Sequence, residues 1–166
     1  MIFETNRFVI RHFTMQDLEP FHGMQSNEKV MRYIKKPLNY EESKTELKKF
    51  IGYYTDTTRF FRLWAIENKS YSDFVGLCGV YHNELNENEI AYRLRERFWG
   101  QGIGLEIAKG LISYCFEELG LEEIIANVDE ENTGSVRILE REMRFVEREY
   151  VEGRERYSRK YRLVKE

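Results

Sequence analysis

Three glycines in five residues separate a strand-like segment from a helical one, and this junction constrains the fold more than any other feature. The strand-like segment is 89–94, and the loop carries Gly100, Gly102 and Gly104. Glycine lets backbone N–H groups approach a ligand because no Cβ is in the way. The first turn of a helix adds unpaired N–H groups and a partial positive charge. The junction therefore predicts either a phosphate or pyrophosphate site or, without a ligand, a tight strand-to-helix turn.

The spacing of the glycines argues against the two most familiar nucleotide loops. A dinucleotide-binding loop has the pattern G-x-G-x-x-G, but here the residue after Gly104 is Leu105. A nucleotide triphosphatase loop needs G-K-S or G-K-T, which the chain lacks. A small nucleotide-binding module remains an alternative, although neither standard pattern supports it.

Hydrophobic periodicity predicts a mixed α+β fold in one domain, 1–166, with three layers and a mostly antiparallel sheet of about seven strands. Expected strands are 8–12, 60–67, 74–81, 89–94, 124–128, 144–151 and 154–164. Helices are expected after Thr14 and over 40–54, 102–119 and 133–141. The order strand, glycine loop, helix, strand predicts a central βαβ crossover with two parallel strands.

Composition excludes several classes of protein. The chain is 42% hydrophobic and 33% charged, which is typical of a globular protein, and no apolar run approaches the roughly 20 residues of a membrane span. The start has no signal-peptide pattern, so a cytoplasmic location is expected. Neither Cys78 nor Cys115 has metal-ligand spacing, so we expect buried thiols and no metal.

Charge is unevenly distributed along the chain. The net charge is −3, which disfavours nucleic acid as a partner. The stretch from Glu84 to Glu131 carries 12 acidic and 4 basic residues. This stretch is either a set of solvated surfaces or an acidic rim around a site for a cationic substrate.

Several segments together resemble the GNAT superfamily of N-acetyltransferases. Its pyrophosphate motif, Q/R-x-x-G-x-G/A, falls on Trp99–Gly104, with Trp99 in the place of Gln or Arg. That tryptophan is similar to the branch that includes the ribosomal-protein N-terminal (RimJ/RimL-type) acetyltransferases. E-I-A-Y-R-L at 89–94 resembles the branch's E-I-G-Y-W-I, and V-D-E-E-N-T-G-S-V-R-I-L-E at 128–140 resembles its V-x-x-x-N-x-x-S-x-R-x-L-E.

The chain departs from the family pattern in three places. Ala91 replaces the usual glycine of the central strand, and no glycine precedes Phe145, where the family has L-E-K-x-G-F. Leu139 stands where many relatives have a tyrosine that acts as general acid. The turn after the last helix and the source of the proton for the leaving thiolate are therefore expected to differ.

The resemblance implies a sheet that splays between the fourth and fifth expected strands and binds acetyl-coenzyme A (acetyl-CoA) in the gap. The backbone of Leu94 and Arg95 is expected to bond the pantetheine arm, Arg97 to add charge, and Asn132 to contact the arm or to serve only as a helix cap. The expected pyrophosphate loop comprises Trp99, Gly100, Gln101, Gly102, Ile103, Gly104 and Leu105.

The same resemblance implies an enzyme that moves the acetyl group to a primary amine by direct attack in a ternary complex. Glu89 is expected to deprotonate or attract the amine, Ser135 to donate to the thiolate, and Tyr92 to line the acceptor channel; each also has an ordinary structural role as an alternative. His82 is a second candidate base. A cofactor-binding sensor or scaffold without catalysis is the alternative function.

Expected partners are a small-molecule amine or a protein N-terminus, with no membrane. A monomer and a homodimer both remain open.

Overall fold

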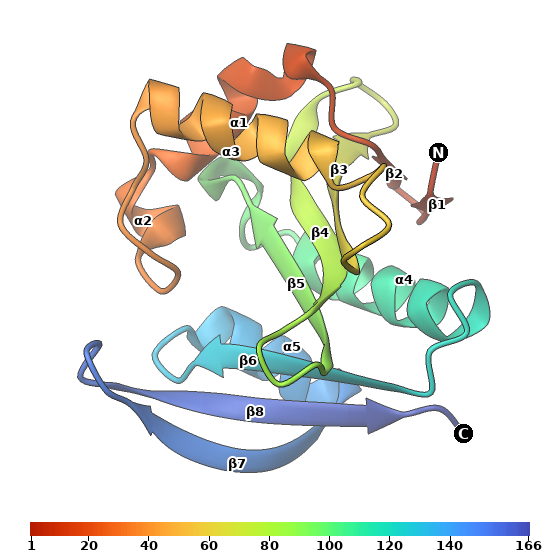
Figure 1. Ribbon diagram of the computed structural model, residues 1–166, viewed down its shortest axis with the longest axis vertical. Coiled ribbons are helices and arrows are strands. Elements are labelled where there is room, and N and C mark those ends of the chain that lie inside the picture. Colours follow the sequence, from red (N-terminus) through yellow and green to blue (C-terminus); the bar gives the residue numbers. More distant parts are fainter.

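A single eight-stranded sheet organises the protein, seen here in a computed structural model that describes residues 1–166 (Figure 1). The strand order is β1-β2-β3-β4-β5-β6-β8-β7, and every neighbouring pair is antiparallel except β5 and β6. The strands are β1 (Phe3–Glu4), β2 (Phe8–Arg11), β3 (Phe61–Asn68), β4 (Phe74–His82), β5 (Asn88–Leu94), β6 (Glu123–Asp129), β7 (Arg144–Val151) and β8 (Arg156–Val164). The helices are α1 (Leu18–Gln25), α2 (Glu28–Met31), α3 (Tyr40–Gly52), α4 (Ile103–Glu117) and α5 (Thr133–Glu142), with 3-10 turns η1 (Met15–Asp17) and η2 (Glu96–Phe98).

The expected fold class and central crossover are confirmed, but the expected strand count is one too low. The additional strand, β1, has two residues, and two residues carry no alternation from which a strand can be predicted. The four-residue helix α2 was missed for the same reason. Its start is nevertheless encoded locally, since the side chain of Asn27 accepts hydrogen bonds from the backbone N–H groups of Lys29 and Val30.

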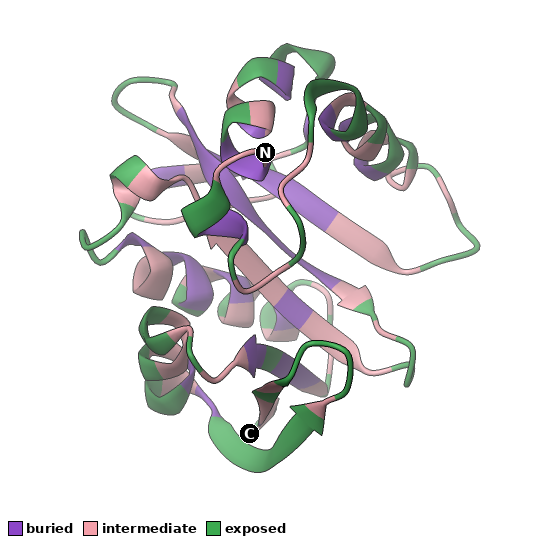
Figure 2. Cartoon of the chain, turned by 90° about the vertical axis from the view of Figure 1, so that its left-hand side faces the viewer, coloured by how far each residue is buried: buried purple, intermediate pink, exposed green.

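Helices cover both faces of the sheet and enclose two hydrophobic cores. Helices α1, α2 and α3 pack on one face, here called the α1–α3 face, and α4 and α5 pack on the other, the α4–α5 face (Figure 1). Figure 2 shows the buried residues concentrated in the strands between these layers. Side chains alternate along β5, so Ile90, Tyr92 and Leu94 belong to the α4–α5 core whereas Ala91 packs against the α1–α3 core.

The sheet splays where β5 meets β6, as expected. The two strands share a single parallel register pair, Glu89 with Ile125, while β6 pairs with β8 from Glu123 to Asp129. Beyond Glu89, the edge of β5 that faces β6 therefore has no strand partner. A free strand edge inside a protein offers backbone donors and acceptors to a bound ligand.

The turn after α5 is built without glycine. Met143 takes an extended conformation, its N–H donates to the Leu139 carbonyl at 2.8 Å, and its side chain is buried. The chain thus enters β7 directly from the helix, which explains why no left-handed residue is needed before Phe145. No helix of the structure is both long and apolar enough to cross a membrane.

Candidate active site

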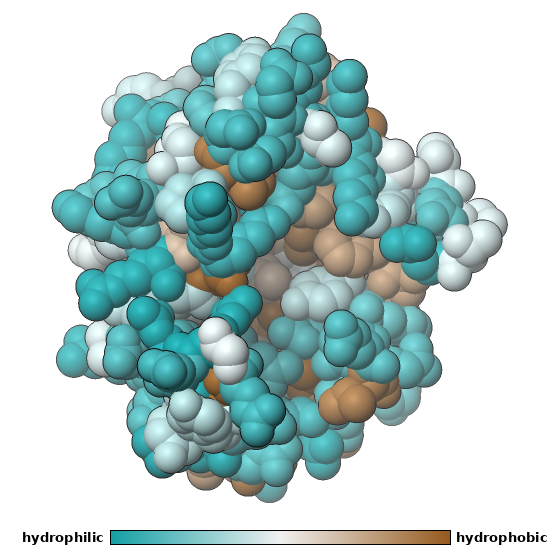
Figure 3. All heavy atoms as spheres, turned by 60° about the vertical axis from the view of Figure 1, so that its left-hand side comes forward, coloured by the Kyte–Doolittle hydropathy of each residue, from teal (hydrophilic) through white to brown (hydrophobic).

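A groove with a volume of about 850 Å³ lies between the carboxyl ends of β5 and β6. In Figure 3 this side of the molecule is hollowed at its centre, with hydrophilic residues around apolar ones. Three segments line the groove: the α2 region (29–34), the chain from Tyr92 through the glycine loop to Leu105, and the start of α5 from Glu131 to Arg141. It lies at the carboxyl ends of two parallel strands that diverge, which is where α/β sheets commonly bind ligands.

The glycine loop has the backbone that the sequence predicted. Gly100 and Gly102 are left-handed, with φ of 70° and 73°, and Gly102 is the N-cap of α4. A Cβ on Gly104 would lie 2.9 Å from Ile138 Cδ1, so the absence of a side chain lets α4 approach α5. The first residues of α4 line the groove, and the unpaired N–H groups of a helix start stabilise an anion placed there.

Residues from the amino-terminal hairpin hold this loop in place. Arg7 donates from both Nη1 and Nη2 to the Gln101 carbonyl at 3.2 Å, and its Nε pairs with Glu106 Oε2 at 2.6 Å. Glu106 Oε1 also accepts from Thr5 Oγ1 at 2.7 Å and from the Arg7 N–H at 2.8 Å. Burial opposes the charge on Glu106, but these hydrogen bonds outweigh it and lower the pKa of that carboxyl. No local sequence pattern predicts this clamp between Arg7 and Glu106.

The predicted cofactor residues divide into two groups. Leu94, Trp99, Gly100, Gly102, Ile103, Gly104, Leu105 and Asn132 line the groove, but Arg95, Arg97 and Gln101 do not.

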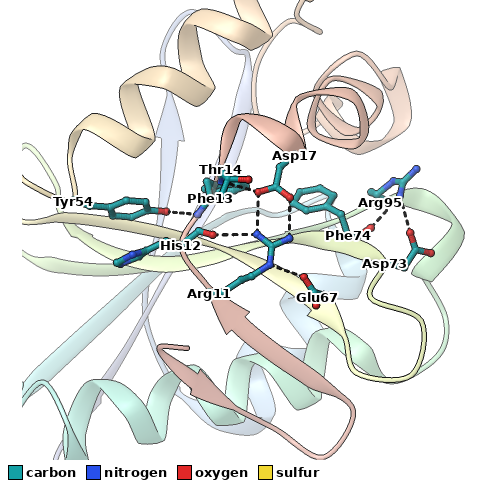
Figure 4. A network of polar contacts seen from close by, with 10 residues as sticks. All are labelled: Arg11, His12, Phe13, Thr14, Asp17, Tyr54, Glu67, Asp73, Phe74 and Arg95. Atoms are coloured by element: carbon teal, nitrogen blue, oxygen red, sulfur yellow. Dashed lines mark hydrogen bonds and ion pairs between the residues drawn. The ribbon is translucent and has the colours of Figure 1, made fainter.

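The excluded residues already bond to other parts of the protein. Arg97 pairs with Asp73. Arg95 donates to the Phe74 carbonyl at 3.0 Å and lies 3.9 Å from Asp73, as Figure 4 shows. The Arg95 N–H bonds to the Val75 carbonyl at 2.9 Å. The Leu94 carbonyl also has a partner, because the Trp99 indole Nε1 donates to it at 3.0 Å.

Two hydroxyl groups meet across the groove. Ser135 Oγ on α5 donates to Tyr92 Oη on β5 at 3.1 Å, and both residues line the cavity. Burial raises the pKa of Tyr92 to about 12, even though the hydrogen bond from Ser135 acts in the opposite direction. The phenol is therefore protonated at neutral pH and can donate a proton to a basic atom in the groove.

The residue that caps the start of α5 also lines the groove. Asn132 is the N-cap residue, its Oδ1 accepts from the Ser135 N–H at 3.4 Å, and its remaining side-chain surface lines the cavity. Leu139 is only 2% exposed and belongs to the core, so it has no access to the groove. Arg137 and Arg141, which were not predicted, also line the groove and lie one helical turn apart.

Glu89 and His82 lie elsewhere, in a shallower cavity of about 470 Å³ at the amino end of β5. Glu89 Oε2 accepts hydrogen bonds from the side-chain amides of Asn83 and Asn127, each at 3.1 Å. Glu89 is also the last residue of β5 that pairs with β6. The structure therefore brings Tyr92 and Ser135 together but leaves Glu89 on the opposite face of the strand, where the gap between the strands begins.

Comparisons with known proteins agree with this geometry. The family model described as "Acetyltransferase (GNAT) domain" matches residues 7–142. The uncharacterized N-acetyltransferase YoaA of Bacillus subtilis is 30% identical over 142 residues, which are 83% of this chain and 79% of that protein.

Two solved structures share the fold. Spermidine N-acetyltransferase from Vibrio cholerae, in complex with CoA and spermine, superposes with a TM-score of 0.77 at 21% identity over 95% of each chain. The acetyltransferase from Salmonella typhimurium that modifies the N-terminal serine of ribosomal protein L7/L12 gives 0.80 at 15% identity, over 98% of this chain and 97% of that one.

Proposed function

The chain belongs to the GNAT acetyltransferase family, and from this premise we propose that it transfers the acetyl group of acetyl-CoA to a primary amine by direct attack in a ternary complex. The observation that carries the proposal is the groove itself. In it, the left-handed glycines before α4 lie beside the free edge of β5. One wall supplies backbone donors for a diphosphate, and the other supplies strand groups for an amide-containing arm.

The groove fits acetyl-CoA in charge as well as in shape. Arg137 and Arg141 on α5 face the cavity and supply positive charge close to the glycine loop. The absence of a side chain at Gly104 keeps the start of α4 close to α5, because a Cβ there would collide with Ile138. We infer that the loop binds the pyrophosphate, the α5 arginines attract the phosphates, and the edge of β5 holds the pantetheine arm.

Acetyl-CoA supplies an activated acyl carbon, and the residues around the gap control the protons of the transfer. The amine nitrogen forms a bond to the thioester carbon while the bond from that carbon to sulfur breaks. The amine proton passes to Glu89 through ordered water, and the Tyr92 hydroxyl, hydrogen-bonded to Ser135, supplies a proton to the leaving sulfur. Backbone N–H groups on the free edge of β5 stabilise the negative charge on the carbonyl oxygen.

The Tyr92 and Ser135 pair accounts for the absence of a tyrosine at Leu139. The proton donor is moved from α5 to β5, and a hydroxyl from α5 orients it across the groove.

The known acceptors of proteins with this fold include spermidine and a protein N-terminus, so both small amines and N-terminal α-amines are in the proposed range.

Free-thiol release from acetyl-CoA tests the proposal. The enzyme is incubated with pools of polyamines, amino acids, aminoglycosides and short peptides, and the acetylated product is identified by mass spectrometry. We expect at least one pool to accelerate thiol release above hydrolysis and to gain an acetyl group on nitrogen. Calorimetric binding of CoA without acceleration by any pool would favour the sensor or scaffold function instead.

A further inference from the structure

Arg93 places a guanidinium group on the α1–α3 face of β5, one residue from the proposed proton donor but on the other side of the strand. Its Nη1 donates to Gln25 Oε1 at 2.5 Å. Its Nε is buried and has no hydrogen-bond partner. Burial lowers the pKa of Arg93 to about 10, so the group is still a cation at neutral pH.

The surroundings of Arg93 do not neutralise it. The nearest carboxylate network is that of Glu46, which accepts from Gln25 and forms an ion pair with Lys35. Arg93 itself makes no ion pair, so Arg93, Lys35 and Glu46 together keep one positive charge. A buried cation without a partner is strongly destabilising unless an anion joins it, and an unbonded buried N–H adds to that cost.

The cation is open to the groove at the end away from the glycine loop. Arg93 lines the cavity together with Val30, Tyr33 and Ile34 of the α2 region. The tip of the β7–β8 hairpin bounds this end, because Arg154 donates to the Ile34 carbonyl at 2.8 Å. Glu131 is the one carboxylate that lines the groove, and it lies beside the cap of α5 on the cofactor side. Val30 and Ile34 are the apolar lining residues at this end, while Lys29 and Arg32 add cationic side chains, so the surroundings of Arg93 favour a bound anion.

We propose that Arg93 binds a carboxylate of the acceptor, and that the acceptor is therefore a small amine that carries a carboxylate, of the amino-acid type. This rests on the proposed acetyl transfer and specifies its substrate class. Nη2 makes no hydrogen bond to the protein, and with the buried, unbonded Nε it forms the two-donor fork that matches a carboxylate.

The same face of β5 orients such a molecule. Glu89, Ala91 and Arg93 follow one another on this face, and Glu89 and Arg93 are about 13 Å apart along the strand. Ala91, between them, packs against the α1–α3 core, and Tyr81 of β4 pairs with Glu89 on the same face. Because Glu89 lines the separate cavity at the amino end of β5, an acceptor whose carboxylate binds Arg93 passes its amine proton to Glu89 only through ordered water.

A paired acceptor panel tests the proposal. L-Amino acids are compared with their carboxamides, which keep the amine and side chain but lose the negative charge. Binding to the CoA-loaded protein is measured by calorimetry, and thiol release from acetyl-CoA is measured in parallel. We expect the preferred acid to bind at least about tenfold more tightly than its carboxamide, because a charged, bidentate contact is lost. The carboxamide's amine is the less basic one, so amine basicity cannot produce this preference.

Two substitutions assign the preference to Arg93. Arg93→Gln should abolish the discrimination between acid and carboxamide, and Arg93→Lys, which keeps the charge without the fork, should retain part of it. Arg62→Gln is the matched control: Arg62 is a half-buried strand arginine whose Nη1 bonds only to backbone carbonyls, and its loss should leave the discrimination intact.

The outcomes separate this proposal from the proposed function. Discrimination in binding without any thiol release would support the carboxylate site and contradict acetyl transfer. Thiol release with equal affinity for acids and carboxamides would overturn the carboxylate site and leave acetyl transfer standing. Absence of binding by either set would also overturn it. The wild-type comparison decides the matter even if an Arg93 variant fails to fold.

Discussion

The two faces of β5 are built in different ways. On the α4–α5 face, Tyr92 and Leu94 lead into the glycine loop, and backbone groups and apolar contacts make most of the site. On the α1–α3 face, Glu89 and Arg93 are polar side chains set among partners from the β4–β5 hairpin, β6 and α1. A site made from a continuous backbone segment suits a ligand shared by a whole family. A site made from scattered side chains can change its ligand one residue at a time.

The largest effect is expected from a substitution on the α1–α3 face of β5, where the acceptor is proposed to bind. Glu89→Gln should lower kcat by on the order of 10²-fold and flatten the acidic limb of the pH–rate profile if Glu89 takes the amine proton. If Glu89 only attracts the ammonium group, the KM for the acceptor should rise while kcat holds. Steady-state kinetics across pH distinguish these roles, and wild-type values of both constants would exclude either one.

On the α4–α5 face, a charge introduced into the glycine loop should mainly affect the binding of CoA. Gly104→Asp should weaken CoA binding by more than about tenfold, because the carboxylate repels the diphosphate and its Cβ displaces Ile138. Gly23→Asp is the control, since it adds the same charge to an exposed position of α1 with no atom within 4 Å of its Cβ. Calorimetry should show an altered affinity for the first variant alone; equal affinities would remove the loop as the binding site.

Removal of the Tyr92 and Ser135 hydroxyl groups on the α4–α5 face should have a smaller effect on turnover. Tyr92→Phe should reduce kcat roughly tenfold with an unchanged KM for acetyl-CoA, because Ser135 or a water can replace the lost proton donor in part. The double variant Tyr92→Phe and Ser135→Ala should be slower than Tyr92→Phe alone. Single-turnover thiol release measures both, and an undiminished rate in the double variant would show that the proton comes from elsewhere.

The smallest expected effect concerns the clamp on the glycine loop. The folded-state pKa of Glu106 is lower than its unfolded value, so its stabilisation is present above about pH 4.3 and disappears as the pH falls through the folded-state pKa. Glu106→Gln should cost about 1 kcal/mol or less at neutral pH, since solvent screens this partly exposed pair with Arg7. Urea unfolding at about pH 7 and about pH 3 should show the difference between wild type and variant shrink; a difference that is constant with pH would contradict an ionic role.

The contrast between the faces also explains what the sequence could predict. The strand, glycine loop and helix from Glu89 to Glu117 were predictable because their signals are local: alternation, left-handed glycines and an apolar helical face. The clamp joins Arg7 to Glu106 across 99 positions, and Arg93 reaches Gln25 across 68. No local pattern encodes such pairs, because packing of α1 and of the amino-terminal hairpin creates them. Arg97 was expected at the phosphates, but it forms an ion pair with Asp73, 24 positions away in the chain. No local pattern encodes that pair either.

Hydrogen exchange measured by mass spectrometry, with and without CoA, locates the bound cofactor without relying on turnover. We expect CoA to slow exchange in peptides that cover residues 99–106 and 131–138, where the loop and the start of α5 line the groove. Little change is expected in the β4–β5 hairpin at 83–87, which bounds the other cavity. Unchanged exchange in the glycine loop, or protection confined to that hairpin, would contradict the assignment of the cofactor to the α4–α5 face.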